Sequence, residues 1–231
     1  MSQQQGIVKG DALQRLASLG FIIGGLLLII FYSLLPRVAD PTNGLDFMTA
    51  WGSKAGLVKL AYLFIAAGLW GIMIGSMGIY RSIAGRGAAW ARLGFYGIIV
   101  GTAIGTLSGG TMMSMVSTMA YWLGAPAADK ASAFTLAAGV GSVCLAVTTM
   151  YIIAEWLALV FLGIGMARSQ VYPKWLGWAA LILGTVNVAV AGIPQFFNGL
   201  TGATQTVFSV VVILSAIWAL IVGIWVARKA W

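Results

Sequence analysis

One acidic residue, Glu155, lies within the long apolar segments of this chain. It follows the run Thr-Met-Tyr-Ile-Ile-Ala and precedes Trp-Leu-Ala-Leu-Val-Phe. A carboxylate at bilayer depth costs about 2.5 to 3.5 kcal/mol on insertion scales, so such a residue usually has a partner or a function. The chemistry open to it is a structural hydrogen bond, an ion pair with a cation of a partner subunit, or the handling of a proton or cation.

Polar residues along the same predicted helix are candidate partners for Glu155. Tyr151 precedes it by four residues, about one helical turn, and Thr148 continues the same face. Asn187, in the next apolar segment, could approach from an adjacent helix. Arg168 follows Glu155 by 13 residues, about 20 Å along a helix axis, and is beyond direct reach. The intramembrane polar candidates are therefore Glu155, Asn187, Thr148 and Tyr151.

The composition removes most cofactor and catalytic chemistry. The chain has no histidine and one cysteine, Cys144, whereas zinc, haem and thiolate clusters need several such ligands. A hydrolase with paired carboxylates would have to recruit Asp11, Asp40, Asp46 or Asp129 from the ends of different helices. We therefore expect no catalytic residues, no enzyme activity and no cofactor, although the apolar interior could hold a bound lipid or quinone.

Methionines at helical spacing are the remaining candidates for a metal site. Met115 and Met119 are four residues apart in a segment rich in serine and threonine. Stacked thioethers can bind the soft ion Cu(I). Copper import proteins usually add a metal-capturing tail, however, and the first residues here offer none beyond Met1. Adaptable packing is the commoner role of methionine, so the segment predicts packing first and copper second.

The overall composition is that of a membrane protein. Of 231 residues, 61% are hydrophobic and 8% charged, whereas about 25% are charged in soluble domains. A membrane-crossing helix needs about 20 apolar residues, and six segments qualify. We predict an all-α polytopic bundle, a single transmembrane domain over 1–231 without a soluble domain, with spans at about 16–35, 57–79, 93–122, 132–167, 176–196 and 206–227.

Two of these spans carry signals for an interruption. The third and fourth are longer than a membrane requires, so each should tilt, extend past the membrane or break. The pair Gly109-Gly110 is the expected break in the third span, because each glycine weakens a helix by about 1 kcal/mol relative to alanine. Pro194 is expected to end or kink the fifth span.

Basic residues predict the orientation of the six spans. With an even number of spans, both termini lie on one side. Cytoplasmic loops carry the excess of lysine and arginine, which places both termini in the cytoplasm. The spread of these residues over short membrane-edge segments argues against a nucleic-acid partner. Nine cations fall on the side of the termini and four on the other: Lys9, Arg15, Arg81, Arg86, Arg92, Arg168, Lys174, Arg228 and Lys229 against Arg37, Lys54, Lys59 and Lys130.

Glycines form two regular stripes on the second and third spans. Such stripes permit close backbone approach between membrane helices. They could pack the second and third spans on each other, receive another protein or another copy of the chain, or hold a flat quinone or pigment. The stripes are Gly68, Gly71, Gly75 and Gly78 on the second span and Gly97, Gly101, Gly105 and Gly109 on the third.

Parts of the chain also resemble a known family. The stretch Arg168-Ser-Gln-Val-Tyr-Pro-Lys-Trp-Leu-Gly-Trp resembles the signature of small bacterial six-helix membrane proteins without assigned function. Arg15-Leu-Ala-Ser-Leu-Gly and Ala91-Arg-Leu-Gly are similar to the starts of other helices in that family. The resemblance implies six helices and supplies no catalytic residues. We expect a multi-pass protein of the bacterial cytoplasmic membrane.

Two functions from different classes follow. The first is a non-catalytic subunit that scaffolds a larger membrane assembly through its glycine-rich helix faces, with lipids and other subunits or copies of itself as partners. The alternative is a small-solute or ion transporter that uses Glu155 and the Ser/Thr/Met-rich third span. A scaffold should have a dry interior and glycines on its outer face. A transporter should have further polar residues that converge on Glu155 from several helices.

Overall fold

The computed structural model describes residues 6–38, 43–199 and 201–231, so Asp40 and Met1 lie outside the described residues. Within these ranges the chain is helical, with no strand. Six helices are long and apolar enough to cross a membrane, which confirms the predicted six-span, all-α fold. They are α1 (Ala12–Ser33), α3 (Ala55–Ser82), α4 (Ala88–Gly124), α5 (Lys130–Ala167), α6 with its continuation (Lys174–Asn198) and α8 (Gly202–Ala230).

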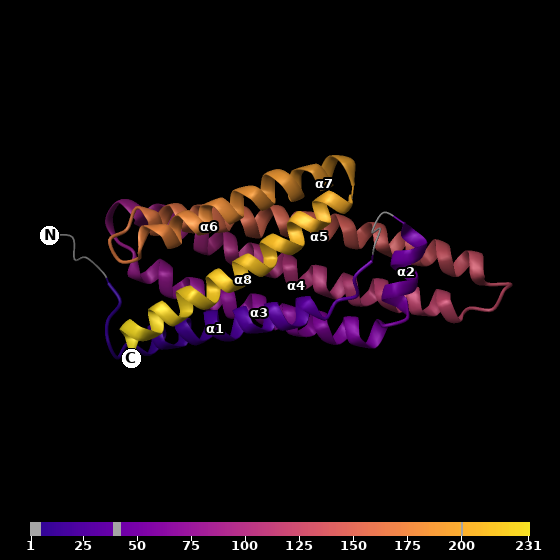
Figure 1. Ribbon diagram of the computed structural model, residues 1–231, viewed down its shortest axis with the longest axis horizontal. Coiled ribbons are helices and arrows are strands. Elements are labelled where there is room, and N and C mark those ends of the chain that lie inside the picture. The colour runs from indigo at the N-terminus through magenta and orange to yellow at the C-terminus, as the bar shows by residue number, and fades with distance from the viewer. Residues whose placement is uncertain (1–5, 39–42, 200) are drawn as a thin grey trace.

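The six helices form a closed ring. Helix α1 packs on α3, α3 on α4, α4 on α5 and α5 on α6; α8 then packs on both α6 and α1. Helix α1 begins and α8 ends at one end of the bundle, while the α4–α5 hairpin extends furthest at the other (Figure 1). We call these the terminal end and the hairpin end. Ring closure leaves a central space between helices that are not direct neighbours.

The glycine stripe on α3 packs on α1, within the same chain. A Cβ atom at Gly71 would lie 2.8 Å from the carbonyl oxygen of Gly20, and one at Gly75 would meet the ring of Phe21 at 2.5 Å. Gly68 faces Leu28 of α1 in the same way. The second and third spans, α3 and α4, do pack on each other as expected, but the glycine stripe of α3 does not face the stripe of α4. Its partner is α1, whose own glycines complete the close contact.

The glycine stripe on α4 packs on α5. A Cβ atom at Gly97 would lie 2.7 Å from that of Ala158, and one at Gly105 would lie 2.8 Å from the ring of Tyr151. Gly109 lies apart from this contact, since its nearest neighbour is the carbonyl oxygen of Tyr62 on α3, at 3.9 Å. Both stripes are thus covered by the chain's own helices.

Helix α4 is continuous through Gly109 and Gly110, so the predicted break is wrong. Backbone groups in a membrane have no water to bond with, so an unbroken helix is favoured even at two glycines. Both long spans are continuous helices, so neither of them contains a break. The hairpin end of α4 and α5 projects past the other helices (Figure 1), and the short helix α2 (Gly44–Gly52) packs on α4.

The fifth span changes its winding near its end. Helix α6 (Lys174–Val186) passes into a π-helical segment, Asn187–Gly192, and then into α7 (Ile193–Asn198). Pro194 lies in the first turn of α7, where its missing N–H is tolerated. The expected irregularity is confirmed, although it takes the form of a wider turn before the proline. Gln195 of α7 then donates to Thr149 of α5 at 2.9 Å.

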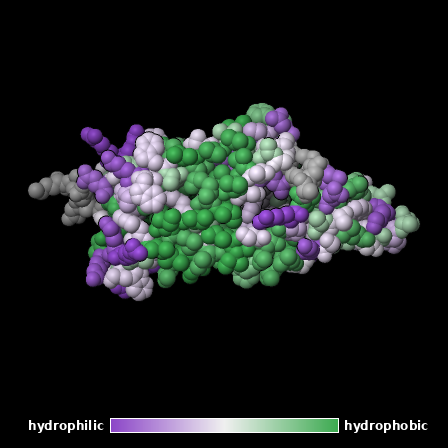
Figure 2. Space-filling model, in the orientation of Figure 1, coloured by the Kyte–Doolittle hydropathy of each residue, from purple (hydrophilic) through white to green (hydrophobic). Residues whose placement is uncertain are grey.

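The surface divides into an apolar belt and two polar ends. Hydrophobic side chains dominate the middle of the molecule, and hydrophilic ones gather at both ends (Figure 2). At the terminal end the two chain ends are tied together, because Gly10 donates its N–H to the carbonyl of Ala230 at 2.9 Å and Arg15 lies over the Trp231 ring. The pattern is that of a multi-pass membrane protein.

Candidate intramembrane binding site

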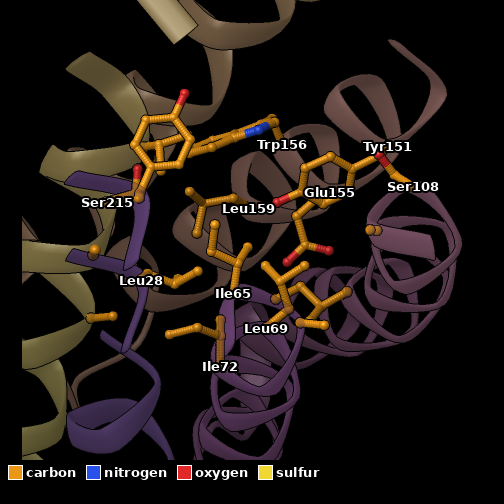
Figure 3. Close-up of a pocket in the computed structure, with 18 of the residues that line it drawn as sticks. Leu28, Ile65, Leu69, Ile72, Ser108, Tyr151, Glu155, Trp156, Leu159 and Ser215 are labelled. Carbon is orange, nitrogen blue, oxygen red and sulfur yellow. The ribbon is translucent and has the colours of Figure 1, made fainter. Parts of the chain in front are cut away.

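A cavity of about 130 Å³ lies in the middle of the ring, and Glu155 is in its wall. We call it the inner cavity. Its lining comes from α1, α3, α4, α5 and α8, helices that ring closure holds around a common space. Figure 3 shows the Glu155 side chain extending from α5 toward Ile65 and Leu69 of α3. The inner cavity is mainly apolar, with few polar groups.

The glycine stripe of α4 makes room for Glu155. A Cβ atom at Gly101 would collide with the Oε2 atom of Glu155, and it would lie 2.7 Å from the Glu155 Cα. Gly105 similarly seats the Tyr151 ring, one turn away. The stripe and the buried acid, which the sequence presents as separate features, are therefore two sides of one contact between α4 and α5.

Several buried polar groups around the inner cavity have no partner. Glu155 is 8% exposed and Trp156 5% exposed. Glu155 Oε2, Trp156 Nε1 and Ser215 Oγ make no hydrogen bond within the described part of the chain. An unpaired buried polar group costs about 1 to 3 kcal/mol. Three such groups, from α5 and α8, thus lie unpaired within the packed wall around the inner cavity, with almost no surface of their own exposed to it.

A larger cleft of about 1050 Å³ adjoins the inner cavity on the side of the hairpin end. We call it the outer cleft. The two spaces are adjacent, because five residues line both of them. The volume is at the top of the range of small-molecule sites, roughly 300 to 1,000 Å³. The shared residues are Tyr32, Tyr62, Met112, Thr148 and Phe208.

Part of the wall of the outer cleft is exposed on α5 and α8. Ala138 and Ser142 of α5 and Val210 and Leu214 of α8 line it, and all four are exposed. Val210 is 52% and Leu214 46% exposed, although both belong to a span with mean hydropathy 2.8. The outer cleft thus reaches the surface of the molecule, and its wall combines these residues with the polar side chains of Arg37, Gln195 and Gln205.

Three of the four predicted polar candidates line the inner cavity, and the fourth, Asn187, does not. Thr148 lines both spaces and is hydrogen-bonded to Ser108 of α4 at 2.7 Å. Tyr151 lines the inner cavity beside Glu155. Asn187 belongs to neither lining; it begins the π-helical segment, fully buried, with both side-chain polar atoms unpaired among the described residues. The expected approach of Asn187 to Glu155 is therefore not seen.

The methionines proposed for copper line the outer cleft. Met115 and Met119 are joined there by Met48, Met112 and Cys144, and four of these five belong to one buried apolar cluster. Flexible thioethers suit a site that adapts to an apolar ligand. Within the described part of the chain, no group of three or more histidine, cysteine or acidic residues could hold a metal ion.

Three polar residues of the site, Ser108, Trp156 and Ser215, are absent from the sequence-based candidates. Each lies on a transmembrane helix among apolar residues, where serine and tryptophan are common. For Ser108 the sequence contains one signal, because the small residues of α4 and the larger residues of α5 have matching spacings when the two helices run antiparallel. The glycines at 94, 97, 101 and 105 on α4 contact residues 162, 158, 155 and 151 on α5, and Ser108 continues that line.

Comparisons with protein-family models, with curated proteins and with solved structures find no match to this chain. The resemblance to small bacterial six-helix membrane proteins therefore stays a prediction.

Proposed function

We propose that this integral membrane protein is a carrier for a small, mostly apolar solute, which it binds inside the helix ring with Glu155 as the principal polar contact. The observation that supports the proposal is the buried Glu155 carboxyl, whose Oε2 atom makes no hydrogen bond with the described residues, in the wall of a cavity that adjoins the larger outer cleft. Ionisable residues at membrane depth typically mark substrate or proton pathways.

The lining favours an apolar solute over a hydrated ion. Between the outer cleft and Glu155 the shared wall consists of two tyrosines, a methionine, a phenylalanine and a threonine. A hydrated cation would lose most of its water there with few oxygen ligands to replace it, and selective ion sites supply such ligands in rings. An uncharged solute loses little on the same path.

The scaffold hypothesis loses its principal support. It required glycine-rich faces free to receive partners, and both stripes are covered by α1 and α5 of the same chain. The interior also contains cavities with polar groups from α4, α5 and α8, as expected for a transporter. For orientation we propose both termini in the cytoplasm of a bacterial cell, because the terminal end carries the larger number of basic residues.

The test is to extract the protein in native lipid discs and to identify its bound small molecules by mass spectrometry. Flux of the identified compound is then measured in reconstituted vesicles. Wild-type protein should be enriched in one compound class and should move it, whereas Glu155→Leu, which removes the principal polar contact, should lose both the binding and the flux. Stoichiometric protein partners without an enriched small molecule would instead restore the scaffold hypothesis.

A further inference from the structure

The two sides of the inner cavity differ in polarity. Side chains with hydroxyl groups lie between Glu155 and the hairpin end, whereas the wall toward the terminal end is apolar. We propose that Glu155 is a proton-binding site that exchanges its proton with water on the hairpin side of the membrane only. This inference rests on the proposed function, since it adds a proton to the cycle of the same site. A carrier with such an acid can use proton entry from one side to drive its solute.

The Glu155 carboxyl presents one of its two oxygens to the inner cavity. Its Oε2 atom is enclosed against Gly101 of α4. The Oε1 atom makes no hydrogen bond with the described residues either, yet it is not among the enclosed unpaired atoms. The exposed 8% of Glu155 therefore includes Oε1, and the space that Glu155 lines is the inner cavity. A proton can thus reach or leave the carboxyl from this cavity.

The inner cavity has room for water. A buried water needs about 10 to 15 Å³ of such space and two to four polar partners, and the cavity has about 130 Å³. The hydroxyl groups of Tyr62 and Tyr151, which also line it, make no hydrogen bond with the described residues and are not enclosed. Water among these groups can pass a proton to Glu155 Oε1. The carboxylate then becomes a carboxylic acid and the hydronium ion becomes water, and no other bond changes.

Hydroxyl groups continue from the inner cavity into the outer cleft. Tyr32, Tyr62 and Thr148 line both spaces. The Tyr32 hydroxyl is hydrogen-bonded at 3.2 Å to that of Ser209, which lines the outer cleft. The outer cleft reaches the surface near the hairpin end, where the exposed Arg37 belongs to its wall. A proton can therefore pass from that surface to Glu155 by way of water and hydroxyl groups.

The wall toward the terminal end is apolar and tightly packed. Phe21 of α1, Ile98 of α4 and Leu162 of α5 line the inner cavity there, and each is at most 1% exposed. Trp218 has a polar atom, but its Nε1 donates to the carbonyl of Leu176 at 2.9 Å. Apolar spaces stay dry and hydrophobic constrictions exclude water, so this wall should block protons. Further along the same helices the buried apolar side chains include Ile79, Met166, Val222 and Val226.

Few other titratable or charged side chains face these two spaces. Within the described lining, α4, α6 and α8 contribute none. The ordinary tyrosine pKa is about 10, so below about pH 9 the tyrosines of the inner cavity should stay protonated, and Glu155 is the acid there that can titrate. The other titratable or charged groups are Tyr32, Tyr62 and Tyr151 in the inner cavity, of which the first two also line the outer cleft, and Arg37 and Cys144 in the outer cleft.

The experiment uses full-length protein in lipid vesicles, with the pH set separately inside and outside. A C-terminal tag reports which way the terminal end faces. Dicyclohexylcarbodiimide, which reacts with protonated carboxyl groups in apolar surroundings, is the probe, and mass spectrometry measures its attachment to Glu155. Between about pH 4 and about pH 9, labelling should follow the pH on the hairpin side. It should fall about tenfold for each unit by which that pH exceeds the pKa of the carboxyl, as the protonated fraction does, and should not respond to the pH on the terminal side.

Leu162 tests the closed side with a matched control. Leu162→Ser places a hydroxyl group in the apolar wall, so the pH on the terminal side should then change the labelling as well. Leu157→Ser makes the same change on the same helix, at a residue that is 41% exposed and lines neither space, and it should behave as wild type. The wild-type measurement decides the proposal by itself if Leu162→Ser does not fold.

Three outcomes would overturn the inference. They are labelling of wild type that follows the terminal-side pH or both sides equally, labelling that does not vary with pH, and no labelling of Glu155 at any pH. A folded Leu162→Ser that still ignores the terminal-side pH would refute the role of the apolar wall. The carrier proposal fails separately: hairpin-side control of labelling without an enriched small molecule or its flux contradicts the carrier alone. Flux of a bound solute with labelling that ignores the hairpin-side pH contradicts only this inference.

Discussion

At the scale of single residues, the site depends on a glycine that leaves room for a buried acid. Gly101 lacks a side chain, and the Glu155 carboxyl occupies the space that a side chain would take. The acid is thereby held in the wall of the inner cavity without a hydrogen bond to Oε2 from the described residues. An apolar residue at this position would avoid the cost of an unpaired buried acid, about 1 to 3 kcal/mol, and this cost is the reason for the binding role that we propose for Glu155.

The first prediction concerns Gly101. Gly101→Ala should destabilise the protein by about 1 to 3 kcal/mol, as overpacking of a tight interior does, because the added Cβ meets both the carboxyl and the Cα of Glu155. Thermal unfolding in detergent measures the loss. Gly110→Ala is the matched control on the same helix, where a Cβ meets nothing within 4 Å. Equal melting temperatures for the two variants would contradict the described α4–α5 contact.

The second prediction separates Asn187 from the site. Its amide is fully buried and unpaired among the described residues, and removal of such a group can be neutral or stabilising. Asn187→Leu, close in volume, should therefore keep or raise the melting temperature and still bind the compound that copurifies with the wild-type protein. A selective loss of that compound in a stable variant would show that Asn187 contributes to the site after all.

At the scale of helices, the sequence predicts the spans well and their partners poorly. Hydropathy and length locate all six, with ends that differ from the structure by a few residues. Helix α2, with nine residues, is too short to give a span signal. Glycine spacing correctly indicates close packing between helices, but it does not say which helix each stripe contacts. The contacts with α1 and α5 depend on the order of the helices in the closed ring. For the same reason, the sequence could not predict which residues line the inner cavity.

The third prediction concerns the connection between α5 and α6 at the terminal end. Burial raises the pKa of Tyr172, and its hydrogen bond with Ser82, at 2.8 Å, offsets part of that increase. In the unfolded chain the Tyr172 hydroxyl releases its proton near the ordinary pKa of 10. In the folded chain the hydroxyl is still protonated at that pH. Since the folded state then binds more protons than the unfolded state, stability should fall as pH rises above about 10.

The measurement is thermal unfolding of wild type and Tyr172→Phe between about pH 8 and pH 11.5. This range extends to both sides of the ordinary tyrosine pKa, about 10. At pH 8 the variant should lose about 1 kcal/mol with the hydrogen bond to Ser82. Above pH 10 the difference should shrink, because phenylalanine has no proton to release. A difference that stays constant across the whole range would contradict this account of Tyr172.

At the scale of the whole molecule, the two ends of the bundle differ in structure. The terminal end is closed by contacts between chain ends and by the Ser82–Tyr172 hydrogen bond. The hairpin end contains the outer cleft, α2 and the projecting α4–α5 hairpin (Figure 1). Because the outer cleft lies nearer the hairpin end, the side of the membrane on which that end lies would decide the side from which a ligand has access.

The last prediction fixes that side. The segment between α3 and α4 contains Arg86, and Lys174 begins α6, so both lie at the terminal end; Asn43 precedes α2 and Asp129 precedes α5, both at the hairpin end. The positive-inside rule places the end with more lysine and arginine in the cytoplasm. Reporters fused after Arg86 or Lys174 should therefore read as cytoplasmic, and reporters after Asn43 or Asp129 as external. The two pairs are controls for each other, because every span must reverse the signal.

If both pairs keep alternating but with the opposite signs, the fold is unaffected and the outer cleft opens toward the cytoplasmic leaflet. That leaflet would then be the source of the ligand. An external signal at 86 together with an external signal at 129 would contradict the membrane crossing of α4 itself.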